Sequence, residues 1–170
     1  MRLSMADPDA QRIAADLIAR DGLFLDRCEW DEWLALYTED CVFWVPAWRN
    51  ESETVTDPDT EVSLIYHDSR VGLEERVHRV RTGKSVTTMP MPRTAHFVSN
   101  LLVTSASAGR IEALSSWQVA IYQPRSATQS TLAGRYEHVL KGTPSGWKIA
   151  SKKVILINDR VPTLVDFYCL

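Results

Sequence analysis

The four histidines of the chain are the side chains best suited to bind a metal ion or to carry a proton. They are His67, His78, His96 and His138. A mononuclear iron site of two histidines and one carboxylate takes its histidines from nearby turns or facing strands. Here each histidine falls in a different predicted element, and no two have the i,i+4 spacing that places ligands on one helix face. We therefore expect hydrogen-bonded or surface histidines rather than a metal site.

The cysteines argue against a Rieske cluster in this chain. That cluster needs two cysteines and two histidines in two short Cys/His pairs. Trp30 and Phe43 stand two residues after Cys28 and Cys41, where such pairs would require histidine. With Cys169, the cysteines are odd in number and scattered, so they predict no disulfide framework and favour a reducing, cytoplasmic compartment.

General acid-base catalysis is the enzymatic function that the residues support best. Two histidines lie in predicted strands, His96 in MPRTAHFVSN and His138 in GRYEHVL. Alternation along the strands gives each histidine three neighbours on its own face: Val98, Asn100 and Leu102 for His96, and Leu132, Tyr136 and Leu140 for His138. Beside Asp40 or Tyr66, a partly desolvated histidine could move a proton at neutral pH. The alternative is a histidine that packs as a wedge, with its ring satisfied by a backbone carbonyl.

The first half of the chain predicts three helices and two short strands. Asp7 is an N-cap and Pro8 a first helical residue, and apolar residues at helical spacing continue this helix over residues 8–25. A short second helix carries one apolar stripe of Trp30, Trp33, Leu34 and Tyr37. The remaining elements are a strand at 41–46, an acidic surface loop at 50–61, a strand at 62–68 and a third helix at 69–83.

From residue 95 onward the hydrophobic period changes to two, which predicts strands. Four long strands separated by turn-forming residues follow, at 96–104, 110–123, 128–140 and 147–158. One face of the second strand is apolar, with Ile111, Ala113, Trp117, Val119 and Ile121. Because helices must cover that face, we expect one α+β domain over residues 1–170, with a strongly curved antiparallel sheet wrapped around N-terminal helices.

The composition argues against two classes of partner. Of the 170 residues 24% are charged, and the net charge is -3, which gives no support for a nucleic-acid-binding surface. No apolar run approaches the roughly 20 residues of a membrane span. The first residues, MRLSMADPDAQ, also lack the apolar core of an export signal. We therefore expect neither nucleic acid nor membrane as a partner.

Aromatic and arginine side chains point to a protein partner instead. Trp44 and Trp48 flank Pro46 at the end of the first short strand. Residues of these types are enriched at interface cores, so Trp48 and Arg93 suggest a partner surface. The predicted third helix adds three arginines, Arg76, Arg79 and Arg81. For these three, a solvated helix face is the alternative interpretation.

Five stretches in register resemble one family, the small or beta subunits of aromatic-ring-hydroxylating dioxygenases, especially the branch that acts on benzoate-like acids. The stretches are FLDRCEWDEWLALYTEDCVFWVPAW, SLIYHDSRVGLEERVHRV, PRTAHFVSN, GRYEHVL and SKKVILINDRVPTLVDFYCL. They cover most of the chain between Leu23 and Leu170. The resemblance implies a nuclear-transport-factor-2-like cone fold, shared with ketosteroid isomerase and scytalone dehydratase.

The resemblance also implies a division of labour between subunits. A large (alpha) subunit would carry a Rieske 2Fe-2S cluster and a mononuclear Fe(II), while this chain would have no catalytic, cofactor-binding or metal-binding residues. Three small subunits would sit beneath three large ones in an alpha3beta3 assembly. The complex would dihydroxylate an aromatic carboxylate with O2 and electrons from NADH, passed through a separate reductase. Benzoate, anthranilate, halobenzoate and terephthalate-type substrates all remain open.

The same resemblance implies roles at subunit interfaces. The residues that would hold strand ends and contacts between small subunits are Arg93, His96, Asn100, Asp159 and Arg160. Those that would lie toward the large subunit are Trp44, Trp48 and Tyr66.

Two functions of other classes stay open beside this one. The first is a stand-alone isomerase or dehydratase of the same fold, with His96 or His138 as its general base. The second is a module that binds a small aromatic molecule without turnover.

Overall fold

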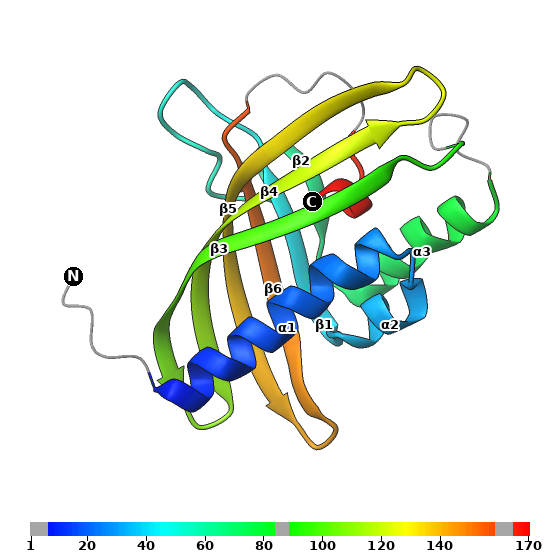
Figure 1. Ribbon diagram of the computed structural model, residues 1–170. Helices are drawn as coiled ribbons and strands as arrows, with labels where there is room; N and C mark the ends of the chain where they lie inside the picture. The colour runs from blue at the N-terminus through cyan, green and yellow to red at the C-terminus, as the bar shows by residue number, and fades with distance from the viewer. Residues whose placement is uncertain (1–6, 84–88, 159–164) are drawn as a thin grey trace.

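Helix α1 (Pro8–Asp26) is the longest helix in the computed structural model, which describes residues 7–83, 89–158 and 165–170. Figure 1 shows it crossing the concave side of a curved sheet. The Asp7 side chain caps the helix by accepting a hydrogen bond from the Asp9 N–H at 3.0 Å. Pro8 takes the first helical turn, where its missing N–H has no partner to lose. The predicted helix over residues 8–25 is confirmed.

Six strands form one sheet in the order β2-β1-β6-β5-β4-β3. Their bounds are Tyr37–Pro46 (β1), Ser63–His67 (β2), Arg93–Ser107 (β3), Arg110–Gln123 (β4), Thr128–Thr143 (β5) and Gly146–Leu156 (β6). Strands β3 to β6 form the predicted antiparallel meander, and β2 pairs antiparallel with β1. β1 and β6 run parallel, which corrects the expectation of a purely antiparallel sheet. A parallel pair needs a long connection, and here that connection contains the four other strands.

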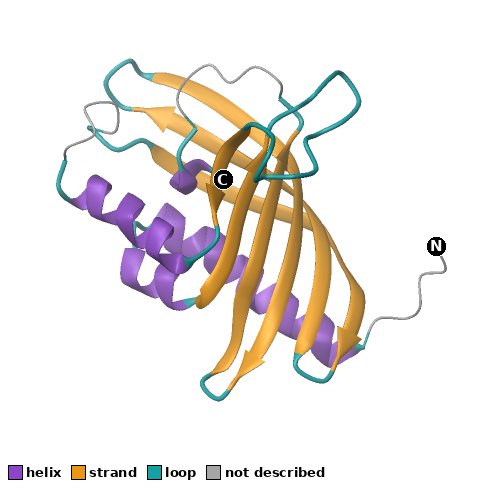
Figure 2. Ribbon diagram, turned by 180° about the vertical axis from the view of Figure 1, so that it is seen from behind, coloured by secondary structure: helices purple, strands orange, loops and turns teal. Residues whose placement is uncertain are grey.

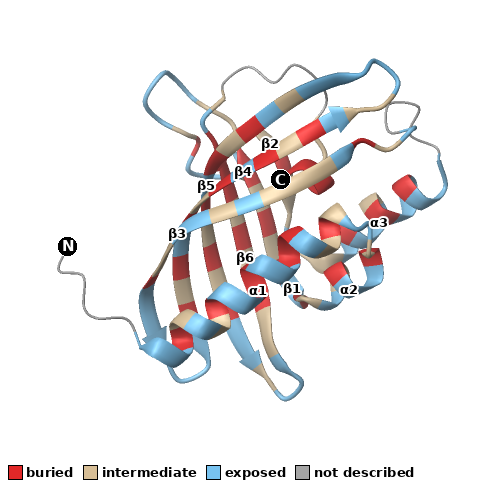
Figure 3. Cartoon of the chain, in the orientation of Figure 1, coloured by how far each residue is buried: buried red, intermediate tan, exposed pale blue. Residues whose placement is uncertain are grey.

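The helices cover one face of this sheet. α3 (Arg70–Arg81) lies with α1 on the covered side, as Figures 1 and 2 show from opposite directions. Burial alternates along the strands (Figure 3), and the apolar face predicted for β4 is buried at all five positions. α3 adds Leu73, Val77 and Val80 to the same core, as its periodicity predicted. The α+β architecture with a curved sheet around the helices is therefore confirmed.

The second helix is shorter than predicted. α2 spans Trp30–Ala35, and Tyr37, expected on its apolar stripe, is instead the first residue of β1. The reason is tertiary, because the Leu36 carbonyl accepts a hydrogen bond from the Ile149 N–H of β6 at 2.8 Å. The helix therefore ends where the chain begins to pair with β6. Among the described helices, none is long and apolar enough to span a membrane.

Strand β3 contains an irregularity that simple alternation does not predict. Its pairing with β4 shifts register between Ser99 and Leu102, and Asn100 has a positive φ of 53°. An extra residue in one strand reverses which positions face inward. His96 lies before this bulge, and after it Val103 rather than Leu102 is buried. The prediction that Asn100 and Leu102 share a face with His96 is therefore wrong.

Side chains of α1 cover the edge of β3, which is the last strand of the sheet. Gln11 Nε2 donates to the Leu101 carbonyl at 3.1 Å, and Gln11 Oε1 accepts from the Val103 N–H at 3.3 Å. The amide thus makes at the bulge the two hydrogen bonds that a neighbouring strand would make. Such cover protects an edge that could otherwise pair with another chain.

Candidate functional site

His96, the predicted proton carrier, is paired with a carboxylate. Its Nδ1 lies 2.6 Å from Asp26 Oδ1, and its backbone N–H donates to Asp26 Oδ2 at 2.9 Å. The Thr94 hydroxyl donates to the same Oδ1 at 2.8 Å. Because Asp26 ends α1 and His96 lies in β3, the pair also holds the helix against the sheet edge.

Neither of the partners predicted for this histidine lies beside it. Asp40 pairs with Lys141 at 3.5 Å, where both side chains are exposed. Tyr66 packs against Trp44 on the opposite face of the sheet. The true partner, Asp26, is 70 residues away in the chain, so no local spacing could indicate it.

The Asp26 carboxylate orients the imidazole. Partial burial acts to raise the pKa of Asp26, but the hydrogen bonds from His96 and Thr94 outweigh it and hold that pKa below its usual value. A carboxylate only accepts hydrogen bonds, so Nδ1 of His96 donates its proton to Asp26, and Nε2 is the ring nitrogen that faces away from the pair. Nε2 is buried and has no partner among the described residues, and the side chain is only 3% exposed. The pair has the chemistry of a general base, but the imidazole itself is buried.

A buried ion pair occupies the interior between the helices and the sheet. Lys152 Nζ of β6 donates to Asp21 Oδ2 of α1 at 2.6 Å. Asp21 Oδ1 accepts from Trp33 Nε1 at 2.8 Å and from the Tyr37 hydroxyl at 2.7 Å. Lys152 Nζ also donates to the main-chain oxygen of Leu170 at 3.0 Å. The lysine is 0% exposed and the aspartate 2%, so the network is part of the core.

The network satisfies both charges. Burial acts to raise the pKa of Asp21, but attraction and hydrogen bonding from Lys152 hold it below its usual value. Burial and the Asp21 charge raise the pKa of Tyr37 well above its usual value, so its hydroxyl stays protonated and donates. Lys152 Nζ also lies 4.5 Å from the centre of the Tyr136 ring, a favourable cation–π distance.

Sequence reasoning missed this network, although one signal was present. Lys152 shares its predicted strand face with the apolar Val154 and Leu156, and a lysine in such a position is buried only when it is paired. The identity of its partner was not readable, because Asp21 lies 131 residues earlier in the chain.

His138 is buried beside the ion pair. It is 2% exposed, its ring centre lies 5.3 Å from that of Tyr136, and its predicted neighbours Leu132 and Leu140 are buried with it. Burial, and then the charge of Lys152, lower the pKa of His138 to about 3. Neither ring nitrogen has a hydrogen-bond partner in the described part of the chain, so the predicted bond to a carbonyl is not made there. A base of such low pKa is poorly matched to proton transfer at neutral pH.

The cysteines and potential metal ligands form no reactive cluster within the described residues. There, no group of three or more histidine, cysteine, aspartate and glutamate residues is placed to hold a metal ion. Burial raises the pKa of Cys41 to about 11 and that of Cys169 to about 12, so both remain thiols at neutral pH. Cys28 is exposed at the surface. Its pKa is also raised, mainly because neighbouring groups remove part of the water around the thiol and secondly by the negative charge of Asp26.

Two of the predicted interface aromatics lie together on the outer face of the sheet. Trp44 and Tyr66 are register partners on β1 and β2, with ring centres 6.5 Å apart. Trp44 Nε1 donates to Ser63 Oγ at 2.8 Å, and Lys153 Nζ lies 4.7 Å from the Trp44 ring centre. Both rings are half-buried, and the neighbouring Leu64 is exposed. We call Trp44, Leu64 and Tyr66 the outer aromatic patch.

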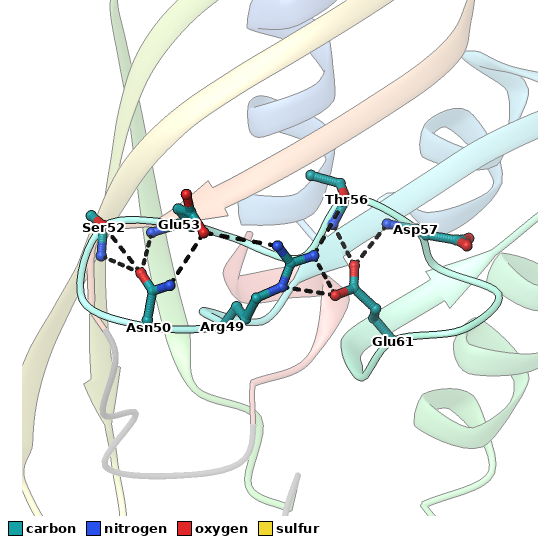
Figure 4. A network of polar contacts seen from close by, with 7 residues as sticks. All are labelled: Arg49, Asn50, Ser52, Glu53, Thr56, Asp57 and Glu61. Atoms are coloured by element: carbon teal, nitrogen blue, oxygen red, sulfur yellow. Dashed lines mark hydrogen bonds and ion pairs between the residues drawn. The ribbon is translucent and has the colours of Figure 1, made fainter.

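Trp48 and Arg49 organise the acidic loop that follows β1. Trp48 Nε1 donates to the Leu156 carbonyl at 2.8 Å, which ties the loop to the end of β6. Arg49 forms an ion pair with Glu61 across the loop, as Figure 4 shows. The Thr56 N–H and then Arg49 donate to the Glu61 carboxylate and lower the pKa of Glu61 to about 2. The sequence predicted the loop but not this internal network.

The remaining interface candidates lie at the other edge of the sheet or outside the described residues. Arg93 is exposed on β3, with its guanidinium 5.8 Å from the Tyr122 ring centre. Asn100 is exposed at the bulge and donates to Ser116 Oγ at 3.3 Å. These two are separated from the outer aromatic patch by the width of the sheet. Two further candidates, Asp159 and Arg160, lie outside the described residues.

Known proteins that resemble the chain in sequence are subunits of oxygenases. The chain is 37% identical over 143 residues to the anthranilate 1,2-dioxygenase small subunit of Acinetobacter baylyi, which covers 84% of this chain and 86% of that one. It is 38% identical over 145 residues to the benzoate 1,2-dioxygenase subunit beta of the same organism, with 85% of each chain covered.

Solved structures agree with this relationship. The beta subunit of the benzoate 1,2-dioxygenase from Burkholderia mallei superposes with a TM-score of 0.77 at 31% identity, covering 100% of this chain and 99% of that one. A hexachlorocyclohexane dehydrochlorinase, at 13% identity and a TM-score of 0.62, shares the fold alone, which confirms the expected nuclear-transport-factor-2-like cone. Residues 20–163 match the family described as the ring hydroxylating beta subunit. The chain therefore belongs to the family of ring-hydroxylating beta subunits.

Proposed function

We propose that the chain is the non-catalytic small subunit of a multicomponent dioxygenase that dihydroxylates an aromatic carboxylate with O2 and electrons from NADH. One observation carries the proposal: the chain matches named small or beta subunits over most of both lengths. These relatives belong to anthranilate, 2-halobenzoate, benzoate and toluate 1,2-dioxygenases. All four names contain benzoate or a ring-substituted benzoate, which supports an aromatic carboxylate as the substrate.

The interior of the chain supports a structural role. The Asp21–Lys152 pair and its hydrogen-bond partners lie buried between the helices and the sheet. His138 is neutral at pH 7, and the free nitrogen of His96 is buried. The two histidines that could act as bases are therefore enclosed by the core rather than presented to a substrate.

The partner in this proposal is a large subunit that carries the Rieske 2Fe-2S cluster and the mononuclear Fe(II), in an alpha3beta3 assembly served by a separate reductase. The outer aromatic patch and Trp48 would face the large subunit, because half-buried aromatic rings beside an exposed leucine suit an interface core. The residues proposed to hold strand ends and contacts between small subunits are Arg93, His96, Asn100, Asp159 and Arg160. Within this set the buried His96 would hold a strand end. The assembly would be cytoplasmic, with residues 1–170 as one domain.

Co-expression with a candidate large subunit tests the proposal. We expect a red-brown complex that keeps this chain through affinity purification and size-exclusion chromatography. A colourless preparation of this chain that forms an active homodimer, and does not bind the large subunit, would overturn the proposal.

Two variants of His96 separate a structural role from direct chemistry. His96→Asn keeps a side-chain donor that can reach Asp26 but cannot transfer a proton as an imidazole does. We expect it to retain assembly and turnover, whereas His96→Ala should weaken assembly. Loss of turnover in His96→Asn, with the complex intact and both iron centres loaded, would instead assign the histidine to catalysis.

The His96–Asp26 pair is the observation that favours the second candidate, a stand-alone isomerase or dehydratase. Its Nδ1–Oδ1 distance of 2.6 Å is that of a carboxylate orienting a general base. This candidate requires activity of the isolated chain on a substrate with an acidic C–H bond, and His96→Asn should abolish that activity.

A further inference from the structure

The segment Val165–Leu170 is built into the core although no strand of the sheet contains it. It includes the short 3-10 helix Phe167–Cys169, drawn in red in Figure 1. The Phe167 ring stacks on Trp33 with ring centres 4.9 Å apart. At the end of the segment, the Leu170 oxygen accepts the hydrogen bond from Lys152. Among the described residues, polar side-chain contacts therefore hold the segment at Leu170 and at Asp166.

The contact at Asp166 runs through Arg76 of α3 to His67 of β2. Arg76 Nη1 donates to Asp166 Oδ1 at 3.0 Å, and the same Oδ1 accepts from the Phe167 N–H at 2.8 Å. Arg76 Nε donates to His67 Nε2 at 2.7 Å. One guanidinium thus joins the end of β2 to the first turn of the terminal segment.

Close packing fixes the ring of His67. A Cβ placed on Gly72, in the first turn of α3, would lie 2.2 Å from His67 Nδ1. Only glycine at this position lets the helix approach the ring so closely. The imidazole therefore has little freedom to turn away from Arg76 when its protonation changes.

The hydrogen bond between Arg76 and His67 exists only while the imidazole is neutral. A guanidinium has no acceptor, so His67 Nε2 must be the acceptor and must lack a proton. Protonation would place a hydrogen on Nε2 and set two positive charges against each other. Other charged groups face the ring: Arg79 also opposes its protonation, while Asp68 and Glu75 favour it. Burial is the largest effect, and the net pKa of His67 is below its usual value.

We propose that His67, Arg76 and Asp166 form a proton-operated latch that holds the segment Val165–Leu170 in the core. When His67 takes up a proton, Arg76 is driven from its position between the imidazole and Asp166. The first turn of the segment then loses its ion pair, and the segment detaches from the interior more often. The latch does not depend on the proposed function, because all three residues and the segment belong to this chain.

Hydrogen–deuterium exchange of the full chain tests the latch. Rates are measured at pH 7.5 and pH 5.5 and corrected for the intrinsic pH dependence of amide exchange. A peptide ending at Leu170 reports on the segment, and a peptide from β4 reports on global unfolding. We expect protection of the terminal peptide to fall several-fold at pH 5.5, with a ceiling of about tenfold, because a released imidazole with the ordinary pKa of 6.5 takes up the proton that the closed latch excludes. Protection of the β4 peptide should fall much less.

Three variants identify the group responsible. His67→Gln offers an oxygen acceptor to Arg76 but does not titrate, so its terminal peptide should keep the same protection at both pH values. His78→Gln, at an exposed histidine of the same helix, is the matched control and should behave as the unmodified chain. Asp166→Asn keeps an acceptor for the Phe167 N–H but removes the charge facing Arg76, so protection should already be lower at pH 7.5.

Three results would overturn the latch. The first is an unchanged terminal peptide between the two pH values in the unmodified chain. The second is an equal loss of protection in the β4 peptide, which would mean global destabilisation. The third is a pH response that persists in His67→Gln. If that variant does not fold, full protection of the terminal peptide in Asp166→Asn at pH 7.5 would overturn the proposal by itself.

Discussion

At the scale of single residues, Lys152 is the position where we expect a substitution to change the stability of the fold most clearly. Its ammonium is fully buried, and its hydrogen bonds go to Asp21 and Leu170. Replacing a buried ion pair by apolar groups is often neutral, whereas removing one partner leaves an uncompensated charge. In this chain, removing one partner and replacing both can be compared directly, because Asp21 and Lys152 can each be changed by a single substitution.

We expect Lys152→Met to lower the free energy of unfolding by about 3–5 kcal/mol, since it leaves the Asp21 carboxylate unpaired in the core. The matched control is Lys153→Met on the outer face, where the partly exposed contact with Glu137 contributes about 1 kcal/mol or less. The double variant Asp21→Asn with Lys152→Met should recover much of the loss. Urea denaturation at pH 7.5 measures all three. Equal stability of Lys152→Met and the unmodified chain would contradict the assigned role of the pair.

The burial of His138 as a neutral ring should make the stability of the fold depend on pH. In the unfolded chain it takes up a proton near its ordinary pKa of 6.5, while the folded ring stays neutral down to about pH 3. The unfolded state therefore binds more protons in this range, and stability falls as pH decreases below 6.5. Between pH 6.5 and pH 5 the contribution of His138 is a loss of about 2 kcal/mol.

Replacing His138 by a group that does not titrate should remove this loss. We expect His138→Phe to lose less stability than the unmodified chain between pH 7.5 and pH 5 in urea denaturation. His78→Gln, in an exposed position, should retain the full loss. An unchanged pH dependence in His138→Phe would show that the buried ring does not cause it.

At the scale of elements, the contact between β5 and β6 depends on Gly134. A Cβ at this position would lie 1.9 Å from the Ile155 carbonyl oxygen, and the clash is with backbone rather than with a movable side chain. We expect Gly134→Ala to cost at least about 2 kcal/mol, because the strands must separate locally. Ala133→Ser, on the opposite face of β5, also adds one atom and should be nearly neutral. Thermal unfolding measures the difference, and equal midpoints for the two variants would contradict this reading of the strand contact.

At the scale of the whole molecule, the sheet has an inner face covered by the helices and an outer face. The ion pair and the core lie on the inner side, and the outer aromatic patch lies on the other. Substitutions on the inner side should therefore lower the stability of the fold. Substitutions on the outer side should instead weaken assembly with the large subunit.

We expect Trp44→Ala to weaken binding to the large subunit about tenfold to a hundredfold, as aromatic residues at interface cores commonly do. The circular dichroism spectrum should remain that of the unmodified chain, because the ring lies outside the core. Leu23→Ala, at an exposed leucine of α1, is the control for removing a surface apolar group. Quantitative pull-down with the large subunit measures both. If Leu23→Ala weakens binding and Trp44→Ala does not, the outer aromatic patch is not the interface.

Local patterns predicted most elements of the fold. Apolar residues at helical spacing indicated α1 and α3, and alternation indicated β4 to β6, because these periods report which side chains face a core. The predicted end of the second helix and the predicted inward face of β3 were wrong for the same reason. Pairing with β6 ends α2 before Tyr37, and a bulge at Asn100 reverses the inward face of β3. Both depend on a neighbouring strand that a local window does not contain.

The amino-acid sequence was enough to identify the family, through five stretches in register, and the fold class, through its periodicities. It also placed Lys152 on an apolar strand face and His96 in a strand, but it could not say what each would meet there. The folded chain was needed to show that Asp21 neutralises the lysine and that Asp26 orients the histidine. The physical reason is that both carboxylates come from α1, and the packing of that helix against the curved sheet closes separations of 131 and 70 residues.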